Sequence, residues 1–242
     1  MSINSIPHIN QPVSKLAAVE KVVGNFIVKP NIKPDFDAAL VSILLPNSPQ
    51  AESIRSLRSQ LLLRWFNVGN KSLAIVGANL GEGCSFVAAN LAVTFAQLGM
   101  RTLLIDTDLR EPRVHHIFKL KNDVGLSDIL SGKTGQVIIN PLESIENLSI
   151  LSAGATQLNA QELLSGAGFG ELLTQTTEQY DVVLVDTAPA ILSADAQAAA
   201  SVCAGALLVS HLNHTKHTQL IEMRDLIAVT NAKIVGSVIN DF

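Results

Sequence analysis

From Ser72 onward, short apolar runs alternate with longer segments that have helical periodicity, and this alternation restricts the possible folds more than any other feature. Strands and helices that alternate in this way form right-handed crossover units. The sequence therefore predicts an α/β fold, a doubly wound and mostly parallel sheet with helices on both faces. Strands are expected at 73–76, 102–105, 148–151, 182–185, 206–209 and 234–239, and helices at 85–98, 126–131, 160–178, 194–200 and 216–229.

The composition agrees with such a core and excludes several classes of protein. Hydrophobic residues make up 48% of the chain but aromatic residues only 4%, which suits a buried parallel sheet. The net charge of −4 argues against broad nucleic-acid binding. No secretion signal is recognisable, and the longest apolar stretch, 182–210, is interrupted by two aspartates and a proline, so we expect no transmembrane span. The two cysteines give no disulfide framework, which favours a cytoplasmic protein.

Two regions are expected along the chain. Residues 1–46 contain five prolines without sustained periodicity and are interpreted as an N-terminal arm or extension, and 47–242 as one domain. The domain begins with a helix that has Ser48 as N-cap and Pro49 at its first position. Ile54, Leu61 and Trp65 recur at helical spacing and form its buried stripe.

The turn after the first expected strand of the domain has most of a Walker A (P-loop) pattern, which is Gly or Ala, four residues, then Gly-Lys-Ser/Thr. The chain reads Ala-Asn-Leu-Gly-Glu-Gly-Cys-Ser over 78–85, between a strand and a helix. Backbone N–H groups near glycines and a helix N-terminus attract phosphate, and Ser85 is placed to bind Mg²⁺. Cys84 stands where the pattern has lysine. The expected nucleotide-binding residues here are Gly81, Glu82, Gly83, Cys84, Ser85 and Phe86.

Acidic residues follow two other expected strands. Asp106 and Asp108 come after 102–105, and Asp186 comes after 182–185. The carboxyl ends of parallel strands meet at one edge of a sheet, where the P-loop also lies. A carboxylate there holds hydrated Mg²⁺ or orients a nucleophile. These three acids are candidate catalytic residues, and Ser85, Asp106 and Asp186 are candidate metal ligands.

The ordered motifs resemble those of the bacterial tyrosine kinases (BY-kinases), over about residues 46–242. Asp106-x-Asp108-x-Arg110 matches the family's Walker A′ motif, and Asp186 with the following Thr-Ala-Pro matches its Walker B motif. Glu52-x-x-Arg55-x-x-Arg58 matches a motif ahead of the P-loop, and 125–130 and 159–164 give smaller matches. The resemblance is greatest to the chain-length-determinant kinases of exopolysaccharide biosynthesis.

The resemblance implies a P-loop NTPase fold of the SIMIBI type that binds ATP or ADP with Mg²⁺. It further implies that Glu52, Arg55 and Arg58 link subunits into a homo-oligomeric ring. The implied partner is a membrane polysaccharide co-polymerase (a chain-length determinant protein), which would hold a cytoplasmic protein peripherally at the inner membrane. Asn240, after the last strand, is a candidate contact to the base, as similar asparagines are in related P-loop folds.

Three departures from the family pattern limit the kinase activity that the resemblance implies. Loss of the loop lysine removes charge-assisted contacts to phosphate, so we expect nucleotide binding about tenfold to a hundredfold weaker and a larger loss in phosphoryl transfer. The sequence has one tyrosine, Tyr180, before a core strand, and ends at Phe242 without the family's tyrosine cluster. Phe86 stands where many P-loops carry a second hydroxyl. Whether the chain is an enzyme, a non-specific protein-tyrosine kinase, is therefore left open.

Several functional hypotheses are compatible with these features. The first is a kinase-like regulator of polysaccharide polymerisation and export with weak or no catalysis. The second is an active tyrosine kinase on other proteins, in which Arg110 or a neighbouring subunit's arginine replaces the lysine. The third is an ATPase of the ParA/MinD type, against which Asn79 argues because those proteins have a lysine there. The last is a structural scaffold that only assembles.

Cysteine and histidine residues near the site have alternative interpretations. Cys84, at a helix N-terminus, is either a reactive thiol with a lowered pKa or an inert substitution, and we favour the inert interpretation. His211, His214 and His217 are spaced three apart, but the segment spans a loop and a first helical turn, so we expect no metal site there. The adjacent His115 and His116 are expected to point in different directions.

Overall fold

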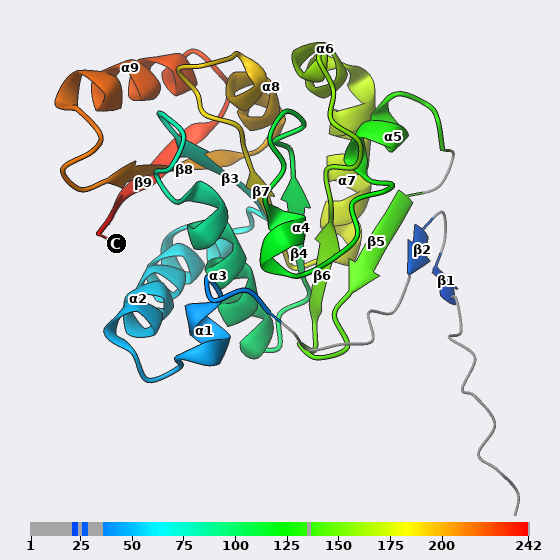
Figure 1. The fold of residues 1–242 in the computed structure, drawn as a ribbon, viewed down its shortest axis with the longest axis horizontal. Coiled ribbons are helices and arrows are strands. Elements are labelled where there is room, and N and C mark those ends of the chain that lie inside the picture. The colour runs from blue at the N-terminus through cyan, green and yellow to red at the C-terminus, as the bar shows by residue number, and fades with distance from the viewer. Residues whose placement is uncertain (1–20, 24–25, 29–35, 135–136, 242) are drawn as a thin grey trace, which may run out of the picture.

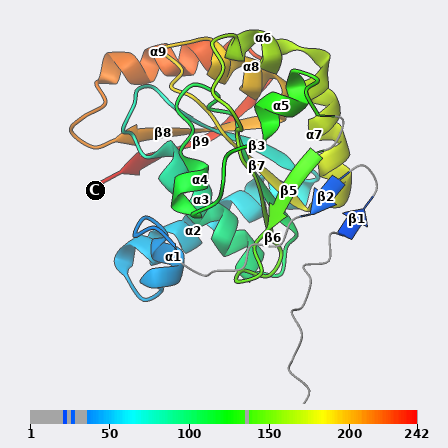
Figure 2. The ribbon, with the colours of Figure 1, turned by 45° about the vertical axis from the view of Figure 1, so that its right-hand side comes forward.

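The computed structural model describes residues 21–23, 26–28, 36–134 and 137–241. The strands are β1 Lys21–Val23, β2 Phe26–Val28, β3 Ser72–Gly77, β4 Thr102–Asp106, β5 Val137–Pro141, β6 Leu148–Leu151, β7 Val182–Asp186, β8 Gly205–His211 and β9 Lys233–Asn240. They form one sheet in the order β1-β2-β5-β6-β4-β7-β3-β8-β9, in which β1 and β2 lie beside β5 at one edge and β9 lies at the other (Figures 1 and 2).

Along the sheet from β6 through β4, β7, β3 and β8 to β9, each strand is parallel to the next, as the sequence predicts. β5 runs antiparallel to β6, and β2 and β1 continue the sheet beyond it. β4 to β7 lie on one side of β3, and β8 and β9 lie on the other, so the sheet is wound in both directions from β3. The predicted fold class is confirmed.

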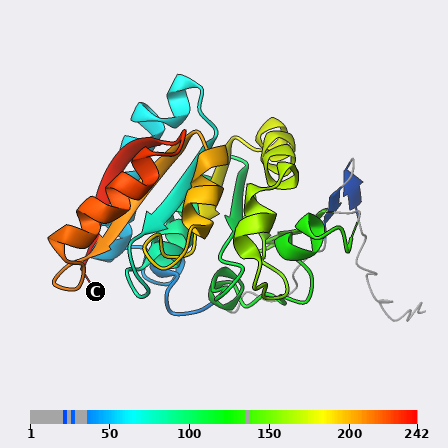
Figure 3. The same ribbon diagram turned by 90° about the horizontal axis from the view of Figure 1, so that it is seen from above.

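Helices cover both faces of the sheet (Figure 3). They are α1 Val41–Leu44, α2 Pro49–Arg64, the 3-10 helix η1 Phe66–Val68, α3 Cys84–Gln97, α4 Val114–Ile117, α5 Leu126–Leu130, α6 Ala160–Ser165, α7 Ala167–Gln179, α8 Asp195–Val202 and α9 His217–Ala228. In the part of the chain that the structure describes, no helix combines the length and apolar character needed to cross a bilayer.

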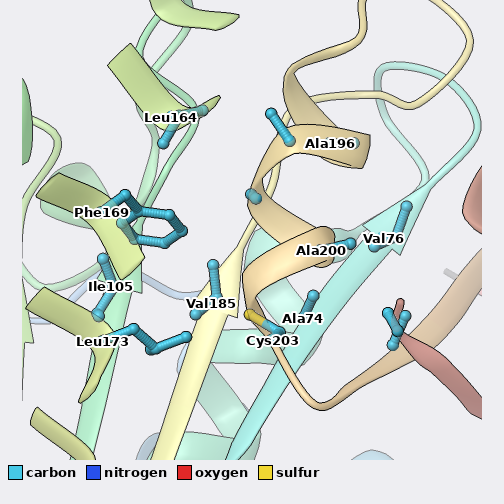
Figure 4. Close-up of a cluster of buried hydrophobic side chains, with 14 of the residues drawn as sticks. Ala74, Val76, Ile105, Leu164, Phe169, Leu173, Val185, Ala196, Ala200 and Cys203 are labelled. Carbon is cyan, nitrogen blue, oxygen red and sulfur yellow. The ribbon is translucent and has the colours of Figure 1, made fainter. Parts of the chain in front are cut away.

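Each face of the sheet has its own apolar core. The core shown in Figure 4 joins α6, α7 and α8 to the strands, with Phe169 and Leu173 near Ile105 and Val185, and Ala200 beside Val76. The opposite core packs α2 and α3 against the other face. Because each strand is covered on both faces, β3, β4 and β7 consist of fully buried residues, which explains why their sequences are continuous apolar runs.

The helix predicted over 160–178 is two helices, which is a correction. Gly166 between them has extended backbone angles (φ −71°, ψ 158°) that end α6 and begin α7. β5 was not predicted, because its run of three β-branched residues at 137–139 is short and followed closely by Pro141.

The described end of the predicted arm, residues 36–46, packs against the domain. Leu40 is fully buried, the Ser42 N–H donates to Oδ1 of Asn90 (2.9 Å), and the Asn90 amide donates to the Ala39 carbonyl (2.8 Å). Most of the predicted arm lies outside the described residues, and the boundary at residue 46 stays a prediction. α2 then begins as predicted, with Ser48 Oγ accepting from the Ala51 N–H.

Candidate nucleotide site

The loop between β3 and α3 has the backbone that a phosphate-binding loop requires. Gly81 and Gly83 have positive φ angles of 80° and 88°, a region that residues with a Cβ rarely adopt. Gly83 is the N-cap of α3, and the helix runs for 14 residues, so its free N–H groups and dipole face the loop. The local sequence therefore builds an anion-binding helix start even without the lysine.

Glu82 is turned inward and holds the loop in shape. The residue is 1% exposed, and its carboxylate accepts from the Ala78 N–H and from Oγ1 of Thr215 (2.8 Å). Its own carbonyl accepts from the Asn240 side chain (3.1 Å). Thus the segment after β8 and the end of β9 are both tied to the loop. Sequence reasoning missed Thr215, because no motif marks a contact between segments so far apart.

Cys84 opens α3 with its thiol close to the end of β3. A methyl group placed on Gly77 would lie 2.5 Å from the Cys84 Sγ. Burial, together with the charges of Asp186 and Glu82, raises the pKa of Cys84 well above its usual value. The thiol is therefore protonated at neutral pH, which contradicts the reactive interpretation and agrees with the inert one.

The two Walker acids meet at the carboxyl edge of the sheet. Asp106 and Asp186 end the adjacent strands β4 and β7 and are paired in register, and both are buried. Burial, and then the charge of Asp186, raises the pKa of Asp106. Burial raises the pKa of Asp186 to about 7, although a hydrogen bond from Ser85 opposes the shift. The three predicted metal ligands therefore lie close together.

The carboxylates of Asp106 and Asp186 differ in the hydrogen bonds that they accept. Asp106 Oδ1 accepts from the Asp108 N–H (3.1 Å), and Oδ2 accepts from the N–H groups of Arg113 (3.2 Å) and Val114 (3.1 Å). Asp186 Oδ1 is buried and, among the described residues, has no hydrogen-bond partner. A buried carboxylate oxygen left unpaired is costly, and a bound cation would satisfy it.

The side chains of Asp108 and Arg110 have different partners. The Asp108 carboxylate accepts from the N–H groups of Arg110 and Glu111 (3.2 and 2.9 Å) and faces the cavity, while burial raises its pKa. The Arg110 guanidinium pairs with the buried carboxylate of Asp195 through two hydrogen bonds. Arg110 is therefore committed elsewhere, which corrects the hypothesis that it replaces the missing lysine.

A cavity of about 350 Å³ lies between the loop and Asp108, and Asp106 and Asp186 lie outside its lining. It is lined by 79–86 together with Asp37, Asp108, Arg113, His116, Ile117, Thr187 and Pro189. Phe86 lies in this wall as predicted, whereas Asn240 is outside it and its amide is used on Glu82, so the base contact of Asn240 stays a prediction. Asp37 and His116 are cavity residues that the sequence patterns did not indicate.

The remaining predicted residues lie away from the cavity. Arg55 pairs with Glu52 on α2 (2.7 Å), and Arg58 donates to the Thr94 carbonyl on α3 (3.1 Å). Their role in a ring interface stays a prediction. Tyr180 is mostly buried against the core, consistent with the packing role expected of it.

Two expectations concern histidines. The one for His115 and His116 is corrected, and the one that His211, His214 and His217 form no metal site stays a prediction. The rings of His115 and His116 lie 3.9 Å apart between centroids, so these side chains contact each other instead of diverging. In the described part of the chain, no three His, Cys, Asp or Glu side chains gather as a metal site.

The residues present fit Mg²⁺ with a nucleotide. Mg²⁺ typically uses one or two carboxylates and takes its other ligands from phosphate and water. Asp186 with its unpaired oxygen, Asp106 and Ser85 supply that donor set, and the loop N–H groups supply the phosphate cradle. The cation that normally completes such a loop is absent from position 84.

Comparisons with known proteins identify the family of the chain. A ParA family model, described as the NUBPL iron-transfer P-loop NTPase, matches residues 69–241. The tyrosine-protein kinase YwqD of Bacillus subtilis (strain 168) is 35% identical over 201 residues, which cover 83% of this chain and 85% of the relative. The putative tyrosine-protein kinase CapB of Staphylococcus aureus is 33% identical, covering 81% and 86%.

A solved structure, that of the chimerical protein CapA2B2, superposes with a TM-score of 0.78 and 32% identity, and the match covers 84% of this chain and 90% of that one. The ParA model describes the wider P-loop group, and the relatives that match along most of their length are tyrosine kinases. The chain therefore belongs to the bacterial tyrosine kinase family of P-loop NTPases.

Proposed function

We propose that the chain is a nucleotide-binding, tyrosine-kinase-like regulator of exopolysaccharide chain length, polymerisation and export, with weak or no phosphoryl transfer. The observation that carries the proposal is Cys84 at the lysine position of an otherwise complete site. Support for nucleotide binding comes from the positive φ angles of the loop glycines and from Ser85 beside the paired acids Asp106 and Asp186. The groups expected to bind nucleotide and Mg²⁺ are therefore retained, whereas the lysine that assists phosphoryl transfer is missing.

The loss falls more on the chemical step than on binding. A lysine in this loop contacts the β- and γ-phosphates, each contact being worth about 1.5–3 kcal/mol in the ground state. The transition state of phosphoryl transfer spreads more charge over the phosphate oxygens, so the missing cation costs more there. The Cys84 thiol is neutral and cannot substitute for it.

The chain's own groups support weak binding of ATP or ADP with Mg²⁺. Free N–H groups at the start of α3 would hold phosphate, and Asp106, Asp186 and Ser85 would hold the cation. When bound, Mg²⁺ would neutralise phosphate charge. Asp108, which lines the cavity and has a raised pKa, would orient an acceptor in any residual transfer by this chain.

Regulation of export requires a partner, which we propose to be a membrane polysaccharide co-polymerase at the inner membrane. The similar structure is a chimerical protein, which supports pairing with a second polypeptide. We further propose a homo-oligomeric ring linked through Glu52, Arg55 and Arg58. Arg55→Ala combined with Arg58→Ala should then shift the assembled species toward monomer in analytical ultracentrifugation. An unchanged distribution would exclude this surface as the ring interface.

A transfer assay tests the catalytic part of the proposal. With Mg·ATP and a poly-tyrosine peptide, we expect the unmodified chain to transfer phosphate no faster than its Asp106→Asn variant. Cys84→Lys should raise the rate above both, because it restores the absent cation in a site that is otherwise built. Rapid transfer by the unmodified chain that Asp106→Asn abolishes would instead establish an active kinase.

A further inference from the structure

We infer that Arg113, at the start of α4, supplies to bound phosphate groups the positive charge that the loop lacks. The inference rests on the proposed nucleotide binding and assigns a phosphate-contacting role to a residue outside the family motifs considered above. Arg113 lines the same cavity as Gly83, Cys84 and Ser85. Among the described residues of that lining, it is the single lysine or arginine.

Hydrogen bonds to Asp106 fix the backbone of Arg113 at the cavity. Its N–H donates to Asp106 Oδ2 (3.2 Å), and the next N–H, that of Val114, donates to the same oxygen (3.1 Å). Asp106 is fully buried at the end of β4. A rigid strand end therefore sets where the Arg113 side chain starts, and the guanidinium reaches outward from that point.

The Arg113 guanidinium is available to a ligand. Its side chain is 62% exposed, and its ion pair with Glu111 is 3.6 Å long between two exposed groups. Such surface ion pairs contribute little to stability. A bound phosphate could therefore replace Glu111 as the partner of Arg113 at little cost in free energy. The charge of Arg113 also acts on Asp186, where it opposes the rise in the pKa of that carboxyl.

The other candidates for this role are less suitable. Arg110 is held by Asp195, with a further hydrogen bond to the Leu158 carbonyl (3.2 Å). His116 also lines the cavity, but the arginine is charged at every physiological pH. A guanidinium also binds phosphate oxygens through two parallel N–H groups, which a lysine does not.

The test is a double-mutant cycle measured as binding rather than turnover. Calorimetric titration with Mg·ADP and Mg·ATP would compare Arg113→Ala and Arg113→Lys in two backgrounds, Cys84 and Cys84→Lys. Arg113→Ala keeps the N–H that bonds to Asp106, and its side chain is exposed, so the fold should survive. Arg224→Ala, which removes an exposed arginine from a surface pair on α9, is the matched control.

We expect Arg113→Ala to weaken binding of both nucleotides about tenfold with Cys84 present, since one charge-assisted contact is lost. Arg113→Lys should recover part of the loss, and Arg224→Ala should change nothing. In the Cys84→Lys background the loss should shrink to about threefold or less, because the lysine takes over the role. Equal losses in both backgrounds, or no loss with Cys84, would overturn the inference while leaving the proposed function intact.

The two proposals fail differently. If the unmodified chain gives no binding heat with either nucleotide at millimolar concentration, the proposed function fails and this inference fails with it. If the unmodified chain binds and Arg113→Ala binds equally well, only the role of Arg113 is refuted.

Discussion

Asp186→Asn should remove much of the pH dependence of stability, because a buried carboxyl with a raised pKa links folding to protonation. The pKa of Asp186 is about 7 in the folded protein and 3.8 ordinarily. The folded state therefore binds more protons than the unfolded state between these values, so stability is lost as pH rises through that window. At about 1.4 kcal/mol per pH unit, the full displacement corresponds to about 4 kcal/mol.

Integrated between pH 5 and pH 8, a group with this pKa lowers the free energy of unfolding by about 2–3 kcal/mol. Asparagine has nearly the same size and does not ionise, so the variant should lose that slope. Asp106, whose pKa is also raised, would leave a residual slope of the same sign. Adding Mg²⁺ at pH 8 should stabilise the unmodified chain more than the variant, because the cation relieves the same buried charge.

The assay is urea denaturation at half-unit steps from pH 5 to pH 8, with EDTA and then with Mg²⁺. Asp225→Asn, on the exposed face of α9, serves as a control for general charge effects. Parallel profiles for the unmodified chain and Asp186→Asn would show that the carboxyl is not desolvated as described, and the account of the metal site would fail with it.

Three further substitutions test how the loop and its scaffold are held. Gly205→Ala should destabilise by about 1–3 kcal/mol, because its new Cβ would lie 2.5 Å from the buried Trp65 ring; an unchanged melting temperature would show that the ring can move. Thr215→Val should cost about 1–3 kcal/mol in urea unfolding, since it leaves the Glu82 carboxylate short of a donor, and it should also weaken nucleotide binding; full affinity would separate this segment from the loop. Ser48→Ala should cost about 1 kcal/mol in thermal unfolding through loss of the N-cap, with Ser48→Asp as the variant that retains it.

The parts of the structure that follow from local pattern could be predicted from the sequence. Apolar runs between helices imply parallel strands, and the carboxyl ends of those strands must share an edge. That geometry places Asp106, Asp186 and Ser85 at the same edge, and the adjacency of β4 and β7 in the sheet then pairs the two acids.

The parts that depend on long-range partners could not be predicted. Arg110 belongs to a motif, yet its side chain forms an ion pair with Asp195, which follows 85 residues later. Glu82 reaches Thr215 across 133 residues for the same reason. The sequence also placed Cys84 at a helix N-terminus, where a thiol pKa usually falls, but tertiary burial and nearby acids reverse that effect.

One local signal was present but not recognised. Gly166 and Gly168 stand inside the segment predicted as a single helix, and glycine is a poor helix former. The break at Gly166 agrees with that preference and sets α6 apart from α7, although Gly168 is accommodated inside α7.

The central claim is that this lysine-free loop still holds a nucleotide. Calorimetric titration of the unmodified chain with Mg·ADP and with Mg·ATP tests it most directly. The account predicts saturable binding of both, about tenfold to a hundredfold weaker than that of the Cys84→Lys variant, and reduced when Asp186→Asn weakens the metal site. No binding heat at millimolar nucleotide would contradict it.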